Sequence, residues 1–244
     1  MNNGMNNKTY LIIGGTGGIG QAMVKQLVQE SAADQTDGAS AKRHSTQVFA
    51  TYHRSEPNFE AENLHWLPMN ISDEDSIQKA ADTIKQTMGH VDWVINCVGL
   101  LHTKTAQPEK ALRQIETAFF LQNMQINALA SLLIAKHIKP LLAKAKRSAS
   151  HPAIFATISA RVGSITDNQL GGWYSYRMSK AALNMGMQPG TVNTQLSAPF
   201  QGNVAEGHLF SPAYSAECLL EVLSGMTAAQ SGSFVDWAGE SIPW

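Results

Sequence analysis

Short apolar runs alternate with segments of helical periodicity along most of this chain. The apolar runs lie at residues 9–13, 47–52, 64–69, 91–98, 153–158 and 232–237. This alternation predicts βαβ units and a parallel sheet. The run at 91–98 is almost entirely apolar, as expected of a central strand that is buried on both faces.

Helical periodicity predicts helices at 19–30, 117–142 (ending near Pro140) and 216–223. A further helix is expected to open at Ser72-Asp73-Glu74-Asp75, which resembles a capping box. Between the second and third strands, the segment 57–63 is too short for a crossover helix. We therefore predict a doubly wound parallel α/β sheet of about seven strands in a single domain over residues 1–244, with 1–8 as a loose N-terminal tail.

Composition narrows the function classes. The chain has 244 residues, 43% of them hydrophobic and 15% charged, and a net charge of −1, so no basic field favours a nucleic-acid partner. Cys97 and Cys218 lie in apolar runs and are expected to be buried thiols, so no metal site is predicted. No apolar stretch approaches the roughly 18 residues of a membrane span. With no leader pattern, we expect a cytoplasmic protein without a membrane partner.

A glycine-rich turn follows the first strand directly. It reads Gly14-Gly15-Thr16-Gly17-Gly18-Ile19-Gly20 and leads into a helix. Glycines at 14, 18 and 20 let the backbone turn tightly and let a pyrophosphate approach the amides at the helix N-terminus. A glycine turn alone can be structural, but the flanking strand and helix favour dinucleotide binding.

The end of the second strand bears on the choice of cofactor. NAD sites often place a carboxylate here for the ribose 2′-hydroxyl, whereas this chain has His53-Arg54 and no carboxylate before Glu56. An arginine at this edge suits a 2′-phosphate, so NADP is preferred and NAD remains possible. The alternative is that Arg54 only caps a solvated loop.

Four further residues lie at positions where a ligand could bind. Asn96 and Gly99 close the fourth strand; Gly99 would leave room for a ribose, and Asn96 could tie strand ends together. Asn127 is a poor helix former inside a long helix and is either a tolerated polar residue or the site of a water-binding kink. Ser159 ends the fifth strand, at the edge where open α/β sheets bind ligands, and is otherwise a turn former.

Tyr176 and Lys180 stand one helical turn apart, so both side chains lie on one helix face. The ammonium is expected to lower the pKa of the phenol and make it a usable proton donor or acceptor. A Pro189-Gly190 turn follows, and Thr194 could reach a carboxamide. Residues 160–175 form a glycine-containing loop that is expected to be flexible and to line the substrate site.

Together these residues resemble the short-chain dehydrogenase/reductase family over nearly the whole chain. The family's glycine motif matches Gly14, Gly18 and Gly20. Its tetrad falls on Asn127, Ser159, Tyr176 and Lys180. Three positions depart from the family pattern: Ile13 replaces a threonine, Asn96-Cys97-Val98-Gly99 replaces Asn-Asn-Ala-Gly, and Asn70 replaces an aspartate near the adenine. The ending at 232–244 is similar to the C-factor (C-signal-like) branch.

The resemblance implies hydride transfer between a nicotinamide and a small carbonyl or alcohol substrate. It assigns proton transfer to Tyr176, polarisation of the substrate oxygen to Ser159, and a water-positioning role to Asn127. It assigns to Lys180 both tuning of the tyrosine and contact with the nicotinamide ribose. It also implies a homodimer or homotetramer. The alternatives are a non-catalytic dinucleotide-binding or signalling protein and, more remotely, a sugar-nucleotide epimerase or dehydratase.

One connection is shorter than this fold requires. Residues 181–188 must finish a helix, turn, and form the next strand before Pro189. A parallel crossover takes about a dozen residues or more. We therefore predict that roughly two dozen residues are absent between about Met185 and Gly186, a number set by a helix and a strand of ordinary length. They are either left out of this sequence or truly deleted from the protein.

Overall fold

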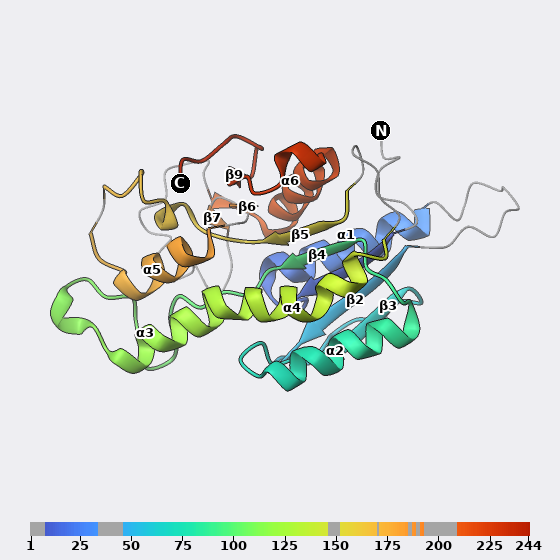
Figure 1. Cartoon of the computed structure of the whole chain (residues 1–244), viewed down its shortest axis with the longest axis horizontal. Helices are drawn as coiled ribbons and strands as arrows, with labels where there is room; N and C mark the ends of the chain where they lie inside the picture. Colours follow the sequence, from blue (N-terminus) through green and yellow to red (C-terminus); the bar gives the residue numbers. More distant parts are fainter. Residues whose placement is uncertain are drawn as a thin grey trace, which may run out of the picture.

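The computed structural model describes residues 8–33, 46–145, 152–169, 171–184, 187–188, 191–192 and 209–244 (Figure 1). The first half of the chain contains β1 (Thr9–Ile13), α1 (Gly18–Ala33), β2 (Gln47–Tyr52), β3 (Leu64–Pro68), α2 (Glu74–Thr87), β4 (Trp93–Asn96), α3 (Thr117–Asn123), a π-helical turn (Met124–Leu129) and α4 (Ala130–Leu142). The second half contains β5 (Ile154–Thr157), α5 (Tyr174–Leu183), β6 (Met187–Gln188), β7 (Thr191–Val192), β8 (Leu209–Phe210), α6 (Pro212–Gly225) and β9 (Val235–Asp236).

The main sheet has five parallel strands in the order β3-β2-β1-β4-β5. Two further parallel pairs, β6 with β9 and β7 with β8, contain two residues per strand. The chain moves outward from β1 to β3 and then crosses back to β4, so the strand order reverses between β1 and β4. This confirms the doubly wound parallel fold, whose ligands bind beyond the carboxyl ends of the strands at such a reversal.

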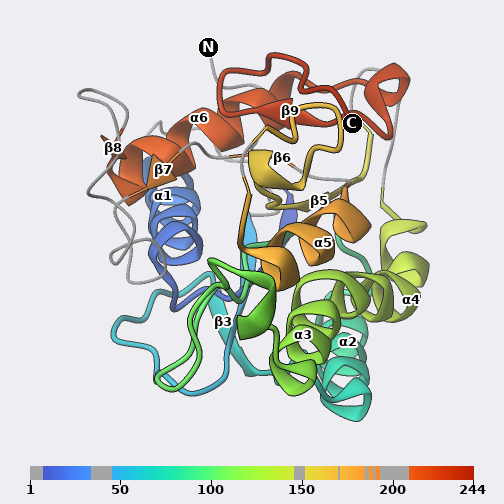
Figure 2. The same ribbon diagram turned by 90° about the vertical axis from the view of Figure 1, so that its left-hand side faces the viewer.

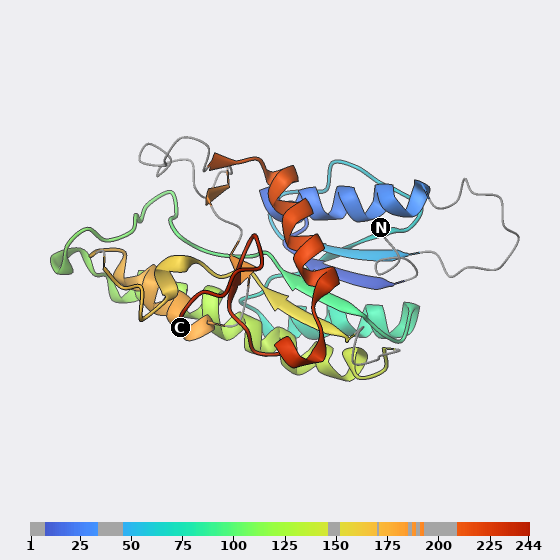
Figure 3. The ribbon, with the colours of Figure 1, turned by 90° about the horizontal axis from the view of Figure 1, so that it is seen from above.

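Helices cover both faces of the sheet, with α1 and α6 on one face and α2 and α4 on the other (Figure 3). The strand pleat divides β1 between them: Tyr10 and Ile12 belong to the core under α1 and α6, whereas Leu11 and Ile13 belong to the core under α2 and α4. All four side chains are at most 1% exposed. A strand covered on both sides is apolar at nearly every position, which explains the run Tyr10-Leu11-Ile12-Ile13 after Thr9.

Several helices differ from the sequence prediction: α1 ends at Ala33 rather than near residue 30, and α6 spans Pro212–Gly225 rather than 216–223. The N-cap of α2 is Asp73 rather than Ser72, because the Asp73 carboxylate accepts a hydrogen bond from the Asp75 amide at 3.1 Å. The long helix at 117–142 is helical throughout, but it widens into a π-helical turn in its middle and continues through Pro140 to Leu142.

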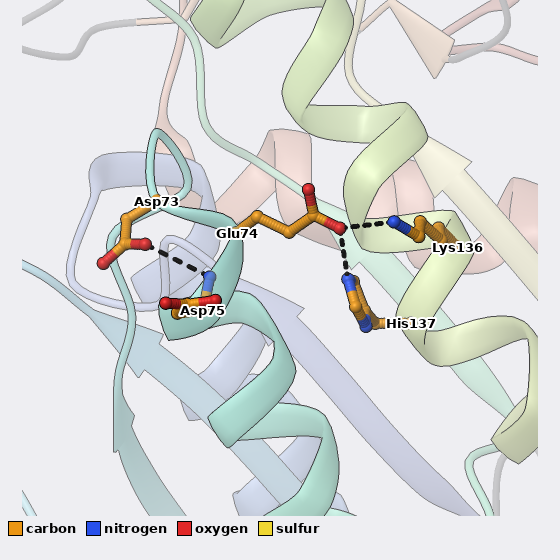
Figure 4. A network of polar contacts seen from close by, with 5 residues as sticks. All are labelled: Asp73, Glu74, Asp75, Lys136 and His137. Atoms are coloured by element: carbon orange, nitrogen blue, oxygen red, sulfur yellow. Dashed lines mark hydrogen bonds and ion pairs between the residues drawn. The ribbon is translucent and has the colours of Figure 1, made fainter.

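A polar contact joins α2 to α4 at the surface (Figure 4). Glu74, the first residue of α2, lies 2.6 Å from Lys136 Nζ and 2.9 Å from His137 Nε2, measured at its Oε1 atom. Hydrogen bonds from Lys136 and then His137 hold the pKa of the Glu74 carboxyl below its usual value. The contact links α2 to α4 over the face of the sheet that both helices cover.

The helical stretch Thr117–Leu142 is long and apolar enough to meet the criterion for a membrane span, with a mean hydropathy of 1.3. The sequence reading did not identify it. In the fold its second half packs Ala130, Ile134, Ile138 and Leu141 against the sheet, so it serves as a core helix.

Candidate active site

The glycine turn adopts the geometry that its sequence predicts. Gly14 has φ +81°, a left-handed conformation that favours glycine. A Cβ at Gly20 would lie 2.3 Å from the Gly14 carbonyl oxygen, so α1 can start this close to β1 only with glycine at position 20. The Gly14 and Gly15 amides donate to Thr51 Oγ1 and Thr51 O at 3.0 and 2.8 Å, which ties the turn to β2.

The first turn of α1 is open beyond this glycine contact. Gly17 and Gly18 are exposed, and Thr16 and Ile19 are half-buried. The turn therefore presents backbone amides at the N-terminal end of a 16-residue helix. Such a helix end attracts a phosphate through its N–H groups and its dipole.

Arg54 and Asn70 follow β2 and β3, at the same sheet edge as the glycine turn. Arg54 is exposed and forms none of the ion pairs found among the described residues. Asn70 is half-buried. Its side-chain Oδ1 accepts from the Ser72 backbone amide at 3.1 Å, and its backbone amide donates to Ser76 Oγ at 2.9 Å. Its side-chain oxygen thus already shapes the turn into α2.

Asn96 is the buried last residue of β4. Its side chain is 1% exposed and donates to Ser131 Oγ of α4 at 2.9 Å, while its Oδ1 accepts from the Val98 amide at 3.1 Å. It therefore ties β4 to α4 and to its own loop, rather than joining neighbouring strand ends as the sequence suggested.

Asn127 occupies the π-helical turn and connects three segments. Its Oδ1 accepts from the Leu100 amide at 2.7 Å, and its Nδ2 lies 2.8 Å from Leu100 O and 2.9 Å from Ser179 Oγ of α5. The side chain is 1% exposed. The π-helical turn is the kink that the sequence suggested at this residue. The turn directs the Asn127 side-chain amide toward α5 and toward the loop after β4 that contains Leu100, here called the strand-end loop.

Tyr176 and Lys180 lie on the buried face of α5, 8% and 2% exposed. Lys180 Nζ donates to Ile158 O at 2.9 Å and lies 5.8 Å from the centre of the Tyr176 ring. Burial raises the pKa of the Tyr176 phenol and lowers the pKa of Lys180 to about 8, because each charged form loses solvation. The expected lowering of the tyrosine pKa is therefore reversed in this structure.

Ser159 is two residues past β5 and directly follows the residue whose carbonyl holds Lys180. Its side chain is 4% exposed, and its Oγ is a buried atom without a hydrogen-bond partner among the described residues. A buried hydroxyl left unpaired is costly, so it points to a ligand at this position.

Gly99 shows how closely these residues converge. A Cβ placed at Gly99 would lie 3.5 Å from Lys180 Nζ and 3.6 Å from Asn127 Oδ1. The strand-end loop, the π-helical turn and α5 thus meet around one spot, bordered by the carbonyl that precedes Ser159. The remaining predicted residues, Pro189, Gly190 and Thr194, lie outside the described residues, as does the suspected joint between Met185 and Gly186.

The position of α5 depends on residues that sequence reasoning missed. The Glu109 carboxylate, 2% exposed, accepts from the Ser175 amide at 3.2 Å and from the Ser175 hydroxyl. The Glu109 carbonyl accepts from the Trp173 amide at 2.5 Å. Trp173 precedes α5 at φ 53°, an unfavourable conformation for an aromatic residue. Glu109 is 66 residues away from Ser175 in a loop, so no local pattern predicted this anchor.

Ser179 was also missed, although it lies between the two catalytic candidates in the sequence. Its Oγ donates to the Tyr176 carbonyl at 2.8 Å and faces Asn127. Only helical periodicity could have indicated it, since positions 176, 179 and 180 share a face.

The loop before α5 contacts the C-terminal segment and α5. Ser164 Oγ donates to Pro243 O at 2.6 Å, the Thr166 amide donates to Trp244 O at 2.8 Å, and a Cβ at Gly163 would lie 2.8 Å from the Lys180 carbonyl carbon. A hollow of about 350 Å³ lies between this loop and α5 and is lined by Tyr174, Arg177 and Met178 but not by Tyr176. The predicted flexibility of the loop and its part in the substrate site stay predictions.

The family model for short chain dehydrogenases matches residues 8–197. C-signal of Myxococcus xanthus is 31% identical over 174 residues, covering 64% of this chain and 94% of that protein. An uncharacterised oxidoreductase of Schizosaccharomyces pombe is 24% identical and covers 98% of both chains.

Solved structures give the same fold. The NADPH-bound carbonyl reductase from chicken fatty liver superposes with a TM-score of 0.77 at 24% identity, covering 97% of this chain and 94% of that chain. A putative short-chain dehydrogenase/reductase from Burkholderia multivorans with bound NADP superposes with a TM-score of 0.72 at 20% identity, covering 97% and 99%. With the family model spanning most of the sequence, the chain belongs to the short-chain dehydrogenase family of oxidoreductases.

Proposed function

We propose that this protein is an NADP-preferring oxidoreductase that acts on a small carbonyl or alcohol substrate, with Tyr176 as the proton donor or acceptor. The observation that carries the proposal is the buried convergence of Asn127, Tyr176 and Lys180 beside a Ser159 hydroxyl that has no partner. A scaffold alone would gain nothing from burying a lysine and an unpaired hydroxyl together.

The cofactor fit is supported by the glycine turn and by Gly99. The amides of 16–19 would hold the pyrophosphate, and the missing side chain at Gly99 leaves Lys180 Nζ within reach of a ribose hydroxyl. When bound, the nicotinamide supplies or accepts the hydride. Arg54, exposed beyond β2, would meet a 2′-phosphate, and the names of the chicken and Burkholderia structures support the choice of NADP.

Each site residue then has a defined role. The Ser159 hydroxyl would donate a hydrogen bond to the substrate oxygen, since no protein group uses it. Tyr176 would transfer the proton at that oxygen. Burial raises the pKa of the phenol, so Tyr176 is protonated at neutral pH and holds the proton that the transfer needs. Asn127 holds the strand-end loop and α5 in register through Leu100 and Ser179.

Substitution of Tyr176 by Phe tests this proposal. Tyr176→Phe should abolish NADPH-dependent turnover on a panel of aldehydes and ketones while leaving NADPH binding, followed by nucleotide fluorescence, within about threefold. Tyr174→Phe is the matched control on the same helix, because Met178 rather than a lysine follows four residues later. Full activity in Tyr176→Phe would refute the assignment of the proton.

The same proteins can be used to test the cofactor preference. NADPH should bind more tightly than NADH, and Arg54→Ala should remove most of this difference without weakening NADH binding. Tighter binding of NADH by the unaltered protein would overturn the preference.

The likeness to C-signal favours one second candidate, a dinucleotide-binding signalling protein without turnover. Retained NADPH binding with no oxidation across the whole panel would support that candidate. A cytoplasmic location and a homodimer or homotetramer remain expectations from the sequence, to be checked by fractionation and by light scattering.

A further inference from the structure

Trp173, the residue directly before α5, has a backbone conformation that aromatic residues rarely adopt. Its φ is 53°, and among the described residues it is the one non-glycine residue in the left-handed region. There a Cβ lies close to the following carbonyl oxygen, so a bulky side chain is strained whereas a glycine is not. Strained residues of this kind cluster at active sites and ligand clamps. The strain therefore points to a function for the indole.

Glu109 holds the strained backbone in place. Its carbonyl oxygen accepts from the Trp173 amide at 2.5 Å, and a Cβ at Gly172 would lie 2.9 Å from the same oxygen. Its carboxylate accepts from the amide and the hydroxyl of Ser175, two residues further along the chain. Every one of these contacts is made by the backbone or by Ser175, so none of them uses the indole. Anchoring of α5 therefore does not explain why position 173 is a tryptophan.

The indole lies on the Tyr176 side of the chain. Gly172 and Tyr174, the two neighbours of Trp173, line the hollow of about 350 Å³ between α5 and the loop before it, whereas Trp173 does not. The Trp173 ring instead stands edge-on to the Tyr176 ring, with the ring centres 6.3 Å apart and the ring planes at 72°. The indole is thus a direct neighbour of the phenol to which we assign the proton.

The two rings differ in their exposure. Tyr176 is 8% exposed, and the Lys180 Nζ atom lies 5.8 Å from the centre of its ring. Trp173 is less completely buried and keeps part of its surface accessible. The indole therefore continues the buried site at Tyr176 outward to the surface of the protein. A substrate that reaches Tyr176 meets a flat, apolar aromatic surface next to the proton.

An indole at this place distinguishes between ketones of similar size. Two aromatic rings prefer edge-to-face or offset-stacked arrangements, and they gain energy beyond the area that they bury. That extra gain corresponds to about a threefold to tenfold change in affinity. A saturated ring of the same size buries a similar area on the indole but lacks this gain. Because the substituents of a carbonyl carbon lie next to the oxygen that Tyr176 would protonate, they are the groups that reach the indole.

We propose that Trp173 is a specificity-determining residue of the substrate site and that it selects carbonyl compounds with an aryl group on the carbonyl carbon. The aryl group packs against the indole while the carbonyl oxygen meets Tyr176 and the Ser159 hydroxyl. Glu109 is a positioning residue, since it holds the backbone conformation that directs the indole to Tyr176. The inference rests on the proposed function, because that function puts the substrate oxygen at Tyr176.

Kinetics with two ketones of matched shape test the inference. Acetophenone and cyclohexyl methyl ketone differ only in whether the six-membered ring is aromatic, and the ratio of their kcat/KM values cancels any loss of folded protein. Trp173→Leu should lower the ratio of acetophenone to cyclohexyl methyl ketone by about threefold to tenfold, and Trp173→Phe should keep most of it. Tyr174→Leu is the matched control, because Tyr174 lines the hollow and its replacement should leave the ratio unchanged. An unchanged ratio in Trp173→Leu, or an equal fall in Tyr174→Leu, would overturn the inference.

Binding of the same ketones separates this inference from the proposed reaction. Ligand-observed NMR on the protein saturated with NADP⁺ follows binding without turnover. If Trp173→Leu weakens binding of acetophenone by about threefold or more, and of cyclohexyl methyl ketone much less, the role of Trp173 is supported even where neither ketone is turned over, and only the proposed reaction fails. Turnover of both ketones with the same binding ratio in the two proteins would leave the reaction intact and refute the role of Trp173. Failure of the unaltered protein to bind either ketone would refute that role as well.

Discussion

Replacement of Lys180 by Met should make the folded protein more stable at neutral pH. The lysine is 2% exposed and packs beside the Tyr176 ring, with one hydrogen bond, to Ile158 O. Burial lowers its pKa from 10.5 to about 8, so the protein holds a cation at pH 7 in a place that disfavours charge. Methionine has a similar length and removes that cost.

The pKa difference sets the magnitude. A change from 10.5 to about 8 at about 1.36 kcal/mol per pKa unit corresponds to about 3 kcal/mol. Loss of the hydrogen bond leaves the Ile158 carbonyl unpaired and costs about 1 kcal/mol. Lys180→Met should therefore raise the free energy of unfolding by about 2 kcal/mol at pH 7, or Tm by about 4–8 °C for a chain of this size.

The gain must depend on pH in a defined direction. Between pH 8 and 10.5 the unfolded chain keeps Lys180 protonated and the folded chain does not, so the unfolded state binds more protons. The stability of the unaltered protein then rises with pH through this window relative to the variant. The advantage of Lys180→Met should shrink to nothing or reverse by pH 10.

Urea denaturation at pH 7 and pH 10, followed by circular dichroism, measures both effects. Lys79→Met is the control, since Lys79 is exposed on α2 and its replacement should change stability by less than about 0.5 kcal/mol. If Lys180→Met were less stable than the unaltered protein at pH 7, or if the difference in stability were the same at both pH values, the claim that the buried Lys180 charge destabilises the fold would be refuted.

Three further substitutions test individual contacts. Gly20→Ala would bring a Cβ within 2.3 Å of Gly14 O, so it should weaken NADPH binding at least tenfold in a fluorescence titration; Gly225→Ala on α6, whose Cβ would meet nothing within 4 Å, should have little effect, and equal losses would contradict the turn geometry. Asn127→Ala leaves the Leu100 N–H and C=O groups without their side-chain partner, so it should lower the free energy of unfolding by about 2–3 kcal/mol in urea denaturation. A decrease under about 0.5 kcal/mol would show that this network is dispensable. Glu109→Gln removes the charge at the start of α5 and should cost about 1–2 kcal/mol by the same method, whereas exposed Glu116→Gln should be neutral; similar values for the two would exclude Glu109 as the anchor.

Much of the fold was predictable because its signals are local. A strand buried on both faces is apolar at nearly every position, so the largely apolar runs at 9–13 and 91–98 identified central strands of the sheet. The glycine turn was recognisable because Gly14 and Gly20 meet within seven residues and only glycine allows that approach. The short connection at 181–188 stays a prediction, because residues 185 and 186 lie outside the described residues.

The contacts that hold the site were not predictable in this way. The Glu109–Ser175 contact joins segments 66 residues apart, and nothing near Glu109 distinguishes it from a solvated loop carboxylate. The sequence suggested a kink at Asn127, but only the packed structure shows which groups that kink brings together, namely the Leu100 backbone and Ser179.

The sequence by itself determined which residues would share a face or a turn. The spacing of Tyr176 and Lys180 places them one helical turn apart in any α-helix, and the order of strands and helices implies a parallel sheet. Only the tertiary structure decided how those residues behave. Protonation depends on solvent and on neighbours from other segments, so burial raised the pKa of Tyr176 although the adjacent lysine alone predicted the opposite.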